Sequence, residues 1–156
     1  MSASPWPRVR WALAATLVLT AVAALLALVV SSDGTTRCTS YPVCFFEGTA
    51  AASTAHALSG AALFLATLVL LWTTVGARHE DRRALPLGLS IPVLVGIMGT
   101  LGASFATGAL STAWVPLQVG FLLLLVALQT TLLFVSYHPS SPSAPPPGRA
   151  DRSSPH

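Results

Sequence analysis

Four long runs of the chain contain no Asp, Glu, Lys or Arg, and this feature limits the possible folds more than any other. The runs are Trp11–Val30, Ala50–Val75, Leu85–Thr107 and Thr112–Val135. A helix of about 20 apolar residues is long enough to cross the hydrocarbon core of a bilayer. A helix of a water-soluble bundle needs a polar face, and none of these runs has a charged one. The pattern predicts an all-α fold, an integral membrane four-helix bundle with up-down topology.

The composition indicates lipid rather than water as the surroundings of this chain. Only 8% of its residues are charged and 53% are hydrophobic, whereas soluble domains carry about 25% charged residues. The net charge is +3, but the arginines flank the apolar runs and form no basic stripe. We therefore expect membrane lipid as a partner and no nucleic acid.

The arginines also predict how the chain is oriented in the cell membrane. Residues 1–10, the turn between the second and third runs, and residues 137–156 lie on one side and carry Arg8, Arg10, Arg78, Arg82, Arg83, Arg149 and Arg152. By the positive-inside rule this side is cytoplasmic, so both termini are cytoplasmic and the loop 31–49 is external. Residues 11–136 form the membrane domain, and the Pro- and Ser-rich residues 137–156 are expected to be a disordered tail. The first run is longer than a typical signal-peptide core, so we expect it to stay uncleaved.

Two cysteines, Cys38 and Cys44, lie in this external loop. Five residues separate them, and a disulfide persists in an oxidising compartment, so we expect a Cys38–Cys44 bridge. One interpretation is a bridge that orders the loop. The other is a redox-active pair, although the spacing differs from the C-x-x-C of thioredoxin-like sites.

His56 is the only histidine within the four runs. An ionisable residue inside a membrane is a candidate functional residue, and here it is a candidate ligand of a haem iron. Ser59 and Gly60 follow one turn later on the same face and leave room for a flat ligand such as a porphyrin. The alternative is a histidine that bonds a neighbouring helix, with Gly60 present for close packing.

Gln118 lies in the fourth run at a depth similar to that of His56. Gln129 follows eleven residues later, close to three full turns, so both amides share one face that points into the bundle. Gln118 is therefore a candidate to meet His56, either directly or through a bound ligand. Gly96, Gly99 and Gly102 give the third run a face that another helix or a ring can approach closely.

Together these features resemble the haem A synthase family, which converts haem O to haem A for terminal oxidases. The loop Cys38-Thr-Ser-Tyr-Pro-Val-Cys44 is similar to the family pattern C-x-x-W-P-L-C, and the helix that follows carries a histidine, as here at His56. The resemblance covers most of residues 8–136 and corresponds to one four-helix half of the usual eight-helix protein. It implies a haem cofactor with His56 as an axial ligand.

Three positions depart from the family pattern. The family has a glutamate where this chain has Ser53, an arginine where it has Ala57, and a second histidine where it has Gln118. The first hypothesis is a haem-handling protein that binds haem O or haem b. If it is an enzyme, the resemblance implies an oxidoreductase that hydroxylates a methyl group of haem O. The second is a non-catalytic accessory subunit or assembly factor of a respiratory oxidase, and the third is a membrane thiol-disulfide oxidoreductase. Self-association into a homo-oligomer is compatible with each.

Overall fold

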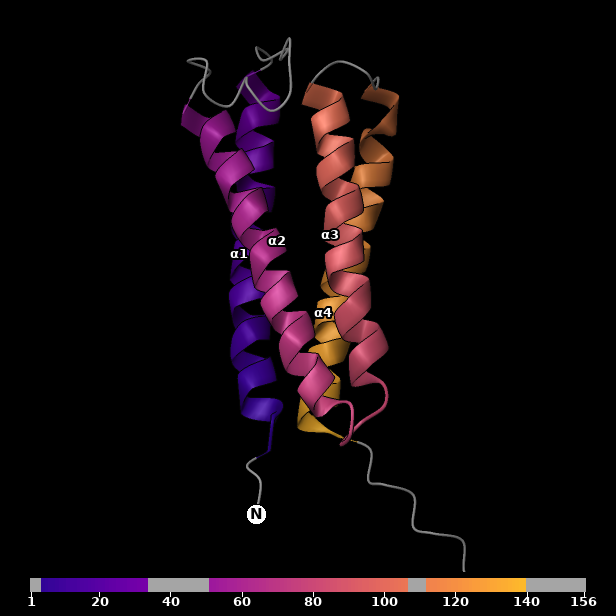
Figure 1. Cartoon of the computed structure of the whole chain (residues 1–156). Coiled ribbons are helices and arrows are strands. Elements are labelled where there is room, and N and C mark those ends of the chain that lie inside the picture. Colours follow the sequence, from indigo (N-terminus) through magenta and orange to yellow (C-terminus); the bar gives the residue numbers. More distant parts are fainter. Residues whose placement is uncertain (1–3, 34–50, 107–111, 140–156) are drawn as a thin grey trace, which may run out of the picture.

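The computed structural model describes residues 4–33, 51–106 and 112–139. These residues form α1 (Trp6–Asp33), α2 (Ala51–Ala77), α3 (Ala84–Ala106), the 3-10 turn η2 (Thr112–Trp114) and α4 (Val115–Tyr137). The described segments contain no strand. Successive helices run in opposite directions, so α1 begins and α4 ends at the same end of the bundle (Figure 1). The all-α four-helix bundle predicted from the sequence is confirmed.

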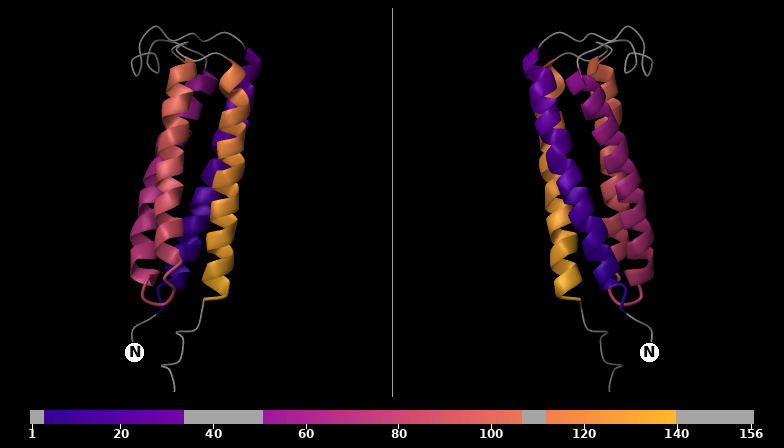
Figure 2. Two further views of the ribbon diagram at one scale, coloured as in Figure 1. Left: turned by 90° about the vertical axis from the view of Figure 1, so that its right-hand side faces the viewer. Right: turned by 90° about the vertical axis from the view of Figure 1, so that its left-hand side faces the viewer.

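Each helix packs along the helices next to it in the chain, and α1 also packs on α4, which closes the ring (Figure 2). We call the end that carries the start of α1, the turn 78–83 and the end of α4 the basic end, because Arg8, Arg10, Arg78, Arg82 and Arg83 lie there. The opposite end is called the His56 end.

The helices extend further at the basic end than the apolar runs do. α1 begins at Trp6 rather than Trp11, with the backbone N–H groups of Arg8 and Val9 bonded to the carbonyl of Pro5. A helix can continue past the hydrocarbon core because its charged residues then reach the headgroup region. α4 begins at Val115, where Pro116 occupies a first-turn position that needs no backbone N–H.

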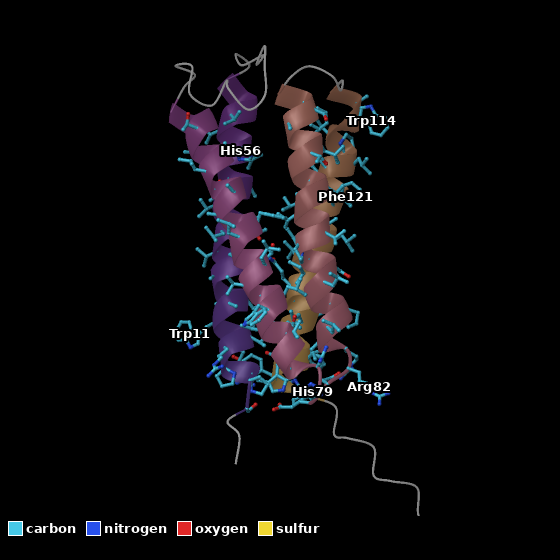
Figure 3. The ribbon with its side chains drawn as sticks, viewed as in Figure 1. Trp11, His56, His79, Arg82, Trp114 and Phe121 are labelled. Atoms are coloured by element: carbon cyan, nitrogen blue, oxygen red, sulfur yellow. The ribbon has the colours of Figure 1, made fainter. Side chains whose placement is uncertain are left out.

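All four helices are long and apolar enough to cross a membrane, over Trp6–Val30, Thr54–Ala77, Ala84–Phe105 and Val115–Tyr137. Large apolar side chains on their outer faces are exposed, as expected for a multi-pass membrane protein in contact with lipid. Trp11 near the basic end and Trp114 at the His56 end both point away from the bundle (Figure 3). Aromatic side chains at these positions suit the two lipid–water interfaces.

The core lies in the half of the bundle nearest the basic end. Its buried residues alternate spacings of three and four on every helix: Trp6, Val9, Leu13, Thr16 and Thr20; Leu63, Thr67, Leu70, Thr74 and Ala77; Ala84, Gly88, Ile91 and Val95; Leu125, Gln129, Leu132 and Ser136. This is the heptad spacing of helices that pack knobs into holes. The heptad core therefore holds the four helices in register over about half of their length.

Several heptad positions are polar, and their hydroxyl groups are bonded within their own helices. Thr16, Thr67 and Thr74 each donate to the carbonyl three residues earlier, and Thr20 donates to the carbonyl of Thr16 at 2.7 Å. Gln129 is fully buried and its Nε2 donates to Oγ1 of Thr20 at 3.1 Å, which joins α4 to α1. Hydrogen bonds of this kind substitute for the hydrophobic effect, which lipid does not provide between helices.

The half of the bundle nearest the His56 end is packed much less closely. None of the side chains of residues 21–30, 54–62, 96–105 and 113–124 is buried. In the view of Figure 1 the α1/α2 pair diverges from the α3/α4 pair toward this end. The bundle is thus tightly packed in one half and open in the other.

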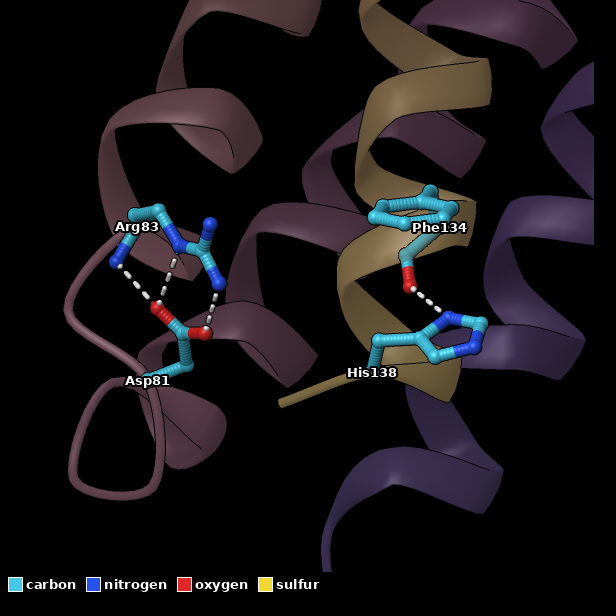
Figure 4. Close-up of polar contacts among 4 residues, drawn as sticks. All are labelled: Asp81, Arg83, Phe134 and His138. Carbon is cyan, nitrogen blue, oxygen red and sulfur yellow. Dashed lines mark hydrogen bonds and ion pairs between the residues drawn. The ribbon is translucent and has the colours of Figure 1, made fainter. Parts of the chain in front are cut away.

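The turn between α2 and α3 is ordered by Asp81. One oxygen of its buried carboxylate accepts from the backbone N–H of Arg83 at 2.9 Å, and the other accepts from Nη2 of Arg83 at 2.9 Å (Figure 4). The first contact forms an Asx-type turn directly before α3. The hydrogen bond and the negative charge of Asp81 raise the pKa of the Arg83 guanidinium, so this arginine stays charged.

Candidate functional site at His56

His56 lies in the second turn of α2 and its imidazole is half-buried against α1 (Figure 3). Nδ1 is 3.1 Å from the backbone carbonyl oxygen of Ala23. A carbonyl can only accept, so this contact is a hydrogen bond when Nδ1 carries the proton, which leaves the lone pair on Nε2. Metal-binding histidines are commonly fixed in this way, with one nitrogen donating to a carbonyl and the other facing the metal.

Ser59 and Gly60 leave space next to the imidazole. Oγ of Ser59 donates to the carbonyl of His56 at 2.8 Å, so the hydroxyl stays on its own helix. A Cβ atom added at Gly60 would meet nothing within 4 Å, and the same holds for Gly99 on α3. Substituents at these two positions would therefore enter open space rather than a packed interface.

Gln118 lies on α4 close to α3. A Cβ atom on Gly102 would be 3.8 Å from Nε2 of Gln118, and the Gln118 side chain is half-buried. Along the bundle, His56 lies between the levels of Trp114 and Phe121 (Figure 3), and Gln118 comes between these two residues on α4. The two candidate residues thus have similar depth, but no direct hydrogen bond joins His56 to Gln118 in the described structure.

Gln129 shares the inward face of α4, as its spacing predicted, but it belongs to the heptad core. Eleven residues of helix place it about 16 Å from Gln118 along the axis. Its amide is bonded to Thr20 and plays no part beside His56. The sequence did not identify the Ala23 carbonyl as the partner of His56, because a backbone carbonyl has no sequence signal.

The residues around His56 fit a haem better than a metal held by protein side chains alone. No group of three or more His, Cys, Asp or Glu side chains comes together within residues 4–33, 51–106 and 112–139. A structural or catalytic zinc needs three or four such ligands. A haem iron is held by one or two axial protein ligands, so a single imidazole is sufficient.

The predicted disulfide cysteines, Cys38 and Cys44, lie outside the described residues, so the predicted bridge stays a prediction. Comparisons of the chain with protein-family models, with curated proteins and with solved structures gave no match. The resemblance to haem A synthases therefore also stays a prediction from the sequence.

Proposed function

We propose that this protein is a haem-binding membrane protein that handles haem O or haem b for the biogenesis of a terminal oxidase, as members of the haem A synthase family do. The observation that carries the proposal is the contact between Nδ1 of His56 and the Ala23 carbonyl. It fixes the ring on α1 and leaves Nε2 as the only histidine nitrogen available to iron among the described membrane-spanning residues.

The open half of the bundle supports this proposal. A porphyrin is a large flat ring that needs an apolar space, and none of the described side chains near the His56 end is buried. Gly60 and Gly99 carry no side chain that would fill the space between the helices. His56 would hold the iron, and Ala23 would keep the imidazole in the tautomer that binds it.

Gln118 stands where the family pattern has its second histidine, and an amide is a poorer iron ligand than an imidazole. When bound, haem would supply redox chemistry at an iron held by His56. Ser53 stands where the family pattern has a glutamate. We therefore propose binding and transfer of haem rather than hydroxylation.

The test is the absorption spectrum of the detergent-purified protein titrated with haem b. We expect a high-spin spectrum, with rapid binding of carbon monoxide by the ferrous form. His56→Ala should abolish binding, and Gln118→His should give a low-spin, six-coordinate spectrum because it supplies a second imidazole. His79→Ala is the matched control, because His79 is exposed in the turn at the other end. Full haem content in His56→Ala would refute the proposal and favour the accessory-subunit alternative, in which His56 only packs against α1.

A further inference from the structure

At the basic end, α1 and α4 meet in a seam formed by the first turns of one helix and the last turn of the other. Arg10 of α1 lies across this seam. Its Nη2 donates to the backbone carbonyl of Ser136, and its guanidinium carbon is 4.1 Å from the centre of the Tyr137 ring. A cation here is also favoured by the negative end of the α4 dipole. Arg10 is thus held in a defined position rather than extended into water.

The donors of the seam are not all matched by acceptors on the protein. Nε of Arg10 is buried and has no hydrogen-bond acceptor in the described structure, and the same is true of the indole N–H of Trp6, one turn earlier on the same face of α1. Arginine and tryptophan side chains only donate. No hydrogen bond joins His138 to either donor in the described structure; its ring stacks on Phe134 and its Nδ1 faces the Phe134 carbonyl at 3.4 Å (Figure 4). Two buried donors near the start of α1 therefore have no acceptor on the described part of the protein.

The charges of the basic end favour an anionic acceptor. Its described residues carry five arginines against two acids, which leaves a net charge of +3 with histidines neutral. The two acids have other partners: Asp81 is paired with Arg83, and Glu80 accepts from the hydroxyl of Ser4 at 3.3 Å. No carboxylate in the described part of the chain lies within ion-pair distance of Arg10.

The position of Arg10 along the helix indicates which anion it meets. Trp11, the next residue, is exposed on the outer face near the basic end, and Tyr137 is exposed beneath the guanidinium. Side chains of this type mark the level of lipid headgroups. We infer that the α1/α4 seam binds the phosphate of an anionic phospholipid, with the half-buried Arg10 guanidinium as the donor and the Tyr137 ring beside it. The inference does not depend on haem binding or on which side of the membrane is cytoplasmic.

Native mass spectrometry of the full chain tests this inference directly. The detergent-solubilised protein is mixed with equal amounts of phosphatidylglycerol and phosphatidylcholine, and the retained lipids are counted. We expect retention of phosphatidylglycerol over phosphatidylcholine. Arg10→Gln should lower this preference about tenfold, from the loss of one hydrogen bond to a charged group. Arg82→Gln removes the same charge from the exposed α2–α3 turn, so it should leave the preference nearly unchanged.

Each other outcome contradicts the inference. Equal losses in Arg10→Gln and Arg82→Gln would mean diffuse charge attraction, and equal retention of the two lipids by the unmodified protein would mean no site. Displacement of the lipid by inorganic phosphate at the same concentration would mean a site for free phosphate. If Arg10→Gln does not fold, the same lipid measurement is made on Arg10→Lys and Arg82→Lys, and these two variants are compared. Only Arg10→Lys should weaken the preference for phosphatidylglycerol. A lysine ammonium lacks the planar set of N–H donors with which a guanidinium can bond the Ser136 carbonyl and a phosphate at the same time.

Discussion

Gly88 is the position where the heptad core is least tolerant of added volume. A Cβ atom at Gly88 of α3 would overlap Oγ1 of Thr74 on α2 and lie 2.8 Å from the Cβ of Thr74. A rotation of the Thr74 side chain moves Oγ1 but not Cβ. Gly88→Ala therefore forces the two backbones apart by at least 0.2 Å, to reach the shortest contacts that Cβ atoms make at 3.0 Å, and by 0.6 Å to reach ordinary contact at 3.4 Å.

A separation of this size loosens the packing of α2 on α3. Gaps of 0.5–1 Å forfeit about a quarter to a half of the attraction between touching atoms. Overpacking of a well-packed core costs about 1–3 kcal/mol. Replacing glycine by alanine also stabilises a helix by about 1 kcal/mol, so the control must be another glycine-to-alanine substitution within a helix. Gly99→Ala on α3 is that control, because a Cβ there meets nothing within 4 Å. We expect Gly88→Ala to unfold with a free energy about 1–3 kcal/mol below that of Gly99→Ala.

Unfolding can be followed in mixed micelles of increasing SDS fraction, with the fluorescence of Trp6 as the reporter, because its side chain is only 3% exposed. Thr74→Gly should rescue Gly88→Ala, since it moves the small residue across the interface. A double-mutant cycle should then show coupling between the two positions. Equal stability of Gly88→Ala and Gly99→Ala, or no coupling with Thr74, would refute the close approach of α2 and α3 at this level of the core.

Three further predictions concern the core, the orientation and the loop. Gln129→Leu should change the free energy of unfolding by less than about 1 kcal/mol. One hydrogen bond inside a membrane protein is worth about 0.6 kcal/mol, and the substitution also removes the buried Oε1 of Gln129, which has no partner in the described structure. A loss above about 2 kcal/mol would reveal a further partner of Gln129. A reporter that is active only outside the cytoplasm should stay silent when fused after Asp81, and an active fusion would reverse the predicted topology. A membrane-impermeant thiol reagent should label Cys38 and Cys44 only after reduction, whereas labelling of untreated cells would exclude the disulfide.

The four spans could be predicted from the sequence because an uncharged apolar run of bilayer length is typical of a membrane-spanning helix and of little else. The alternation of direction followed because each run crosses the membrane once, so successive runs must run in opposite directions. The ends of the helices were less predictable. α1 includes Arg8 and Arg10, and a hydropathy pattern ends where the hydrocarbon ends, whereas backbone hydrogen bonding continues into the headgroup region.

The core could not be identified by hydrophobicity, because the lipid-facing side chains are as apolar as those inside. In a soluble bundle the buried face would be the apolar one. Here the buried face is distinguished instead by small and polar residues at heptad spacing, such as Thr67 and Thr74 on α2 and Gly88 on α3.

At the candidate site the sequence identified the side chains of His56 and Gln118, and the structure adds the residues that contact them. His56 and Gln118 share a depth, but each is packed against a different partner, Ala23 of α1 and Gly102 of α3. Which neighbour an inward-facing residue meets depends on helix rotation and tilt, and in a bilayer these are set by packing rather than by hydropathy. A pattern read along one helix therefore gives the depth of a residue but not its contacts.

The division of the bundle into two halves follows from where each helix has its heptad residues. The buried positions on α1 end at Thr20 and those on α4 begin at Leu125, so the bond between Gln129 and Thr20 lies near the limit of the close-packed half. Beyond it, the inward positions are small or only half-buried, as at Ala23, Gly60 and Gly102. Because the close-packed half alone can hold the four helices together, the packing of the other half is less constrained. A packed protein needs such a division to bind a large ring, since a bundle with a continuous heptad core would have to break helix contacts to admit it.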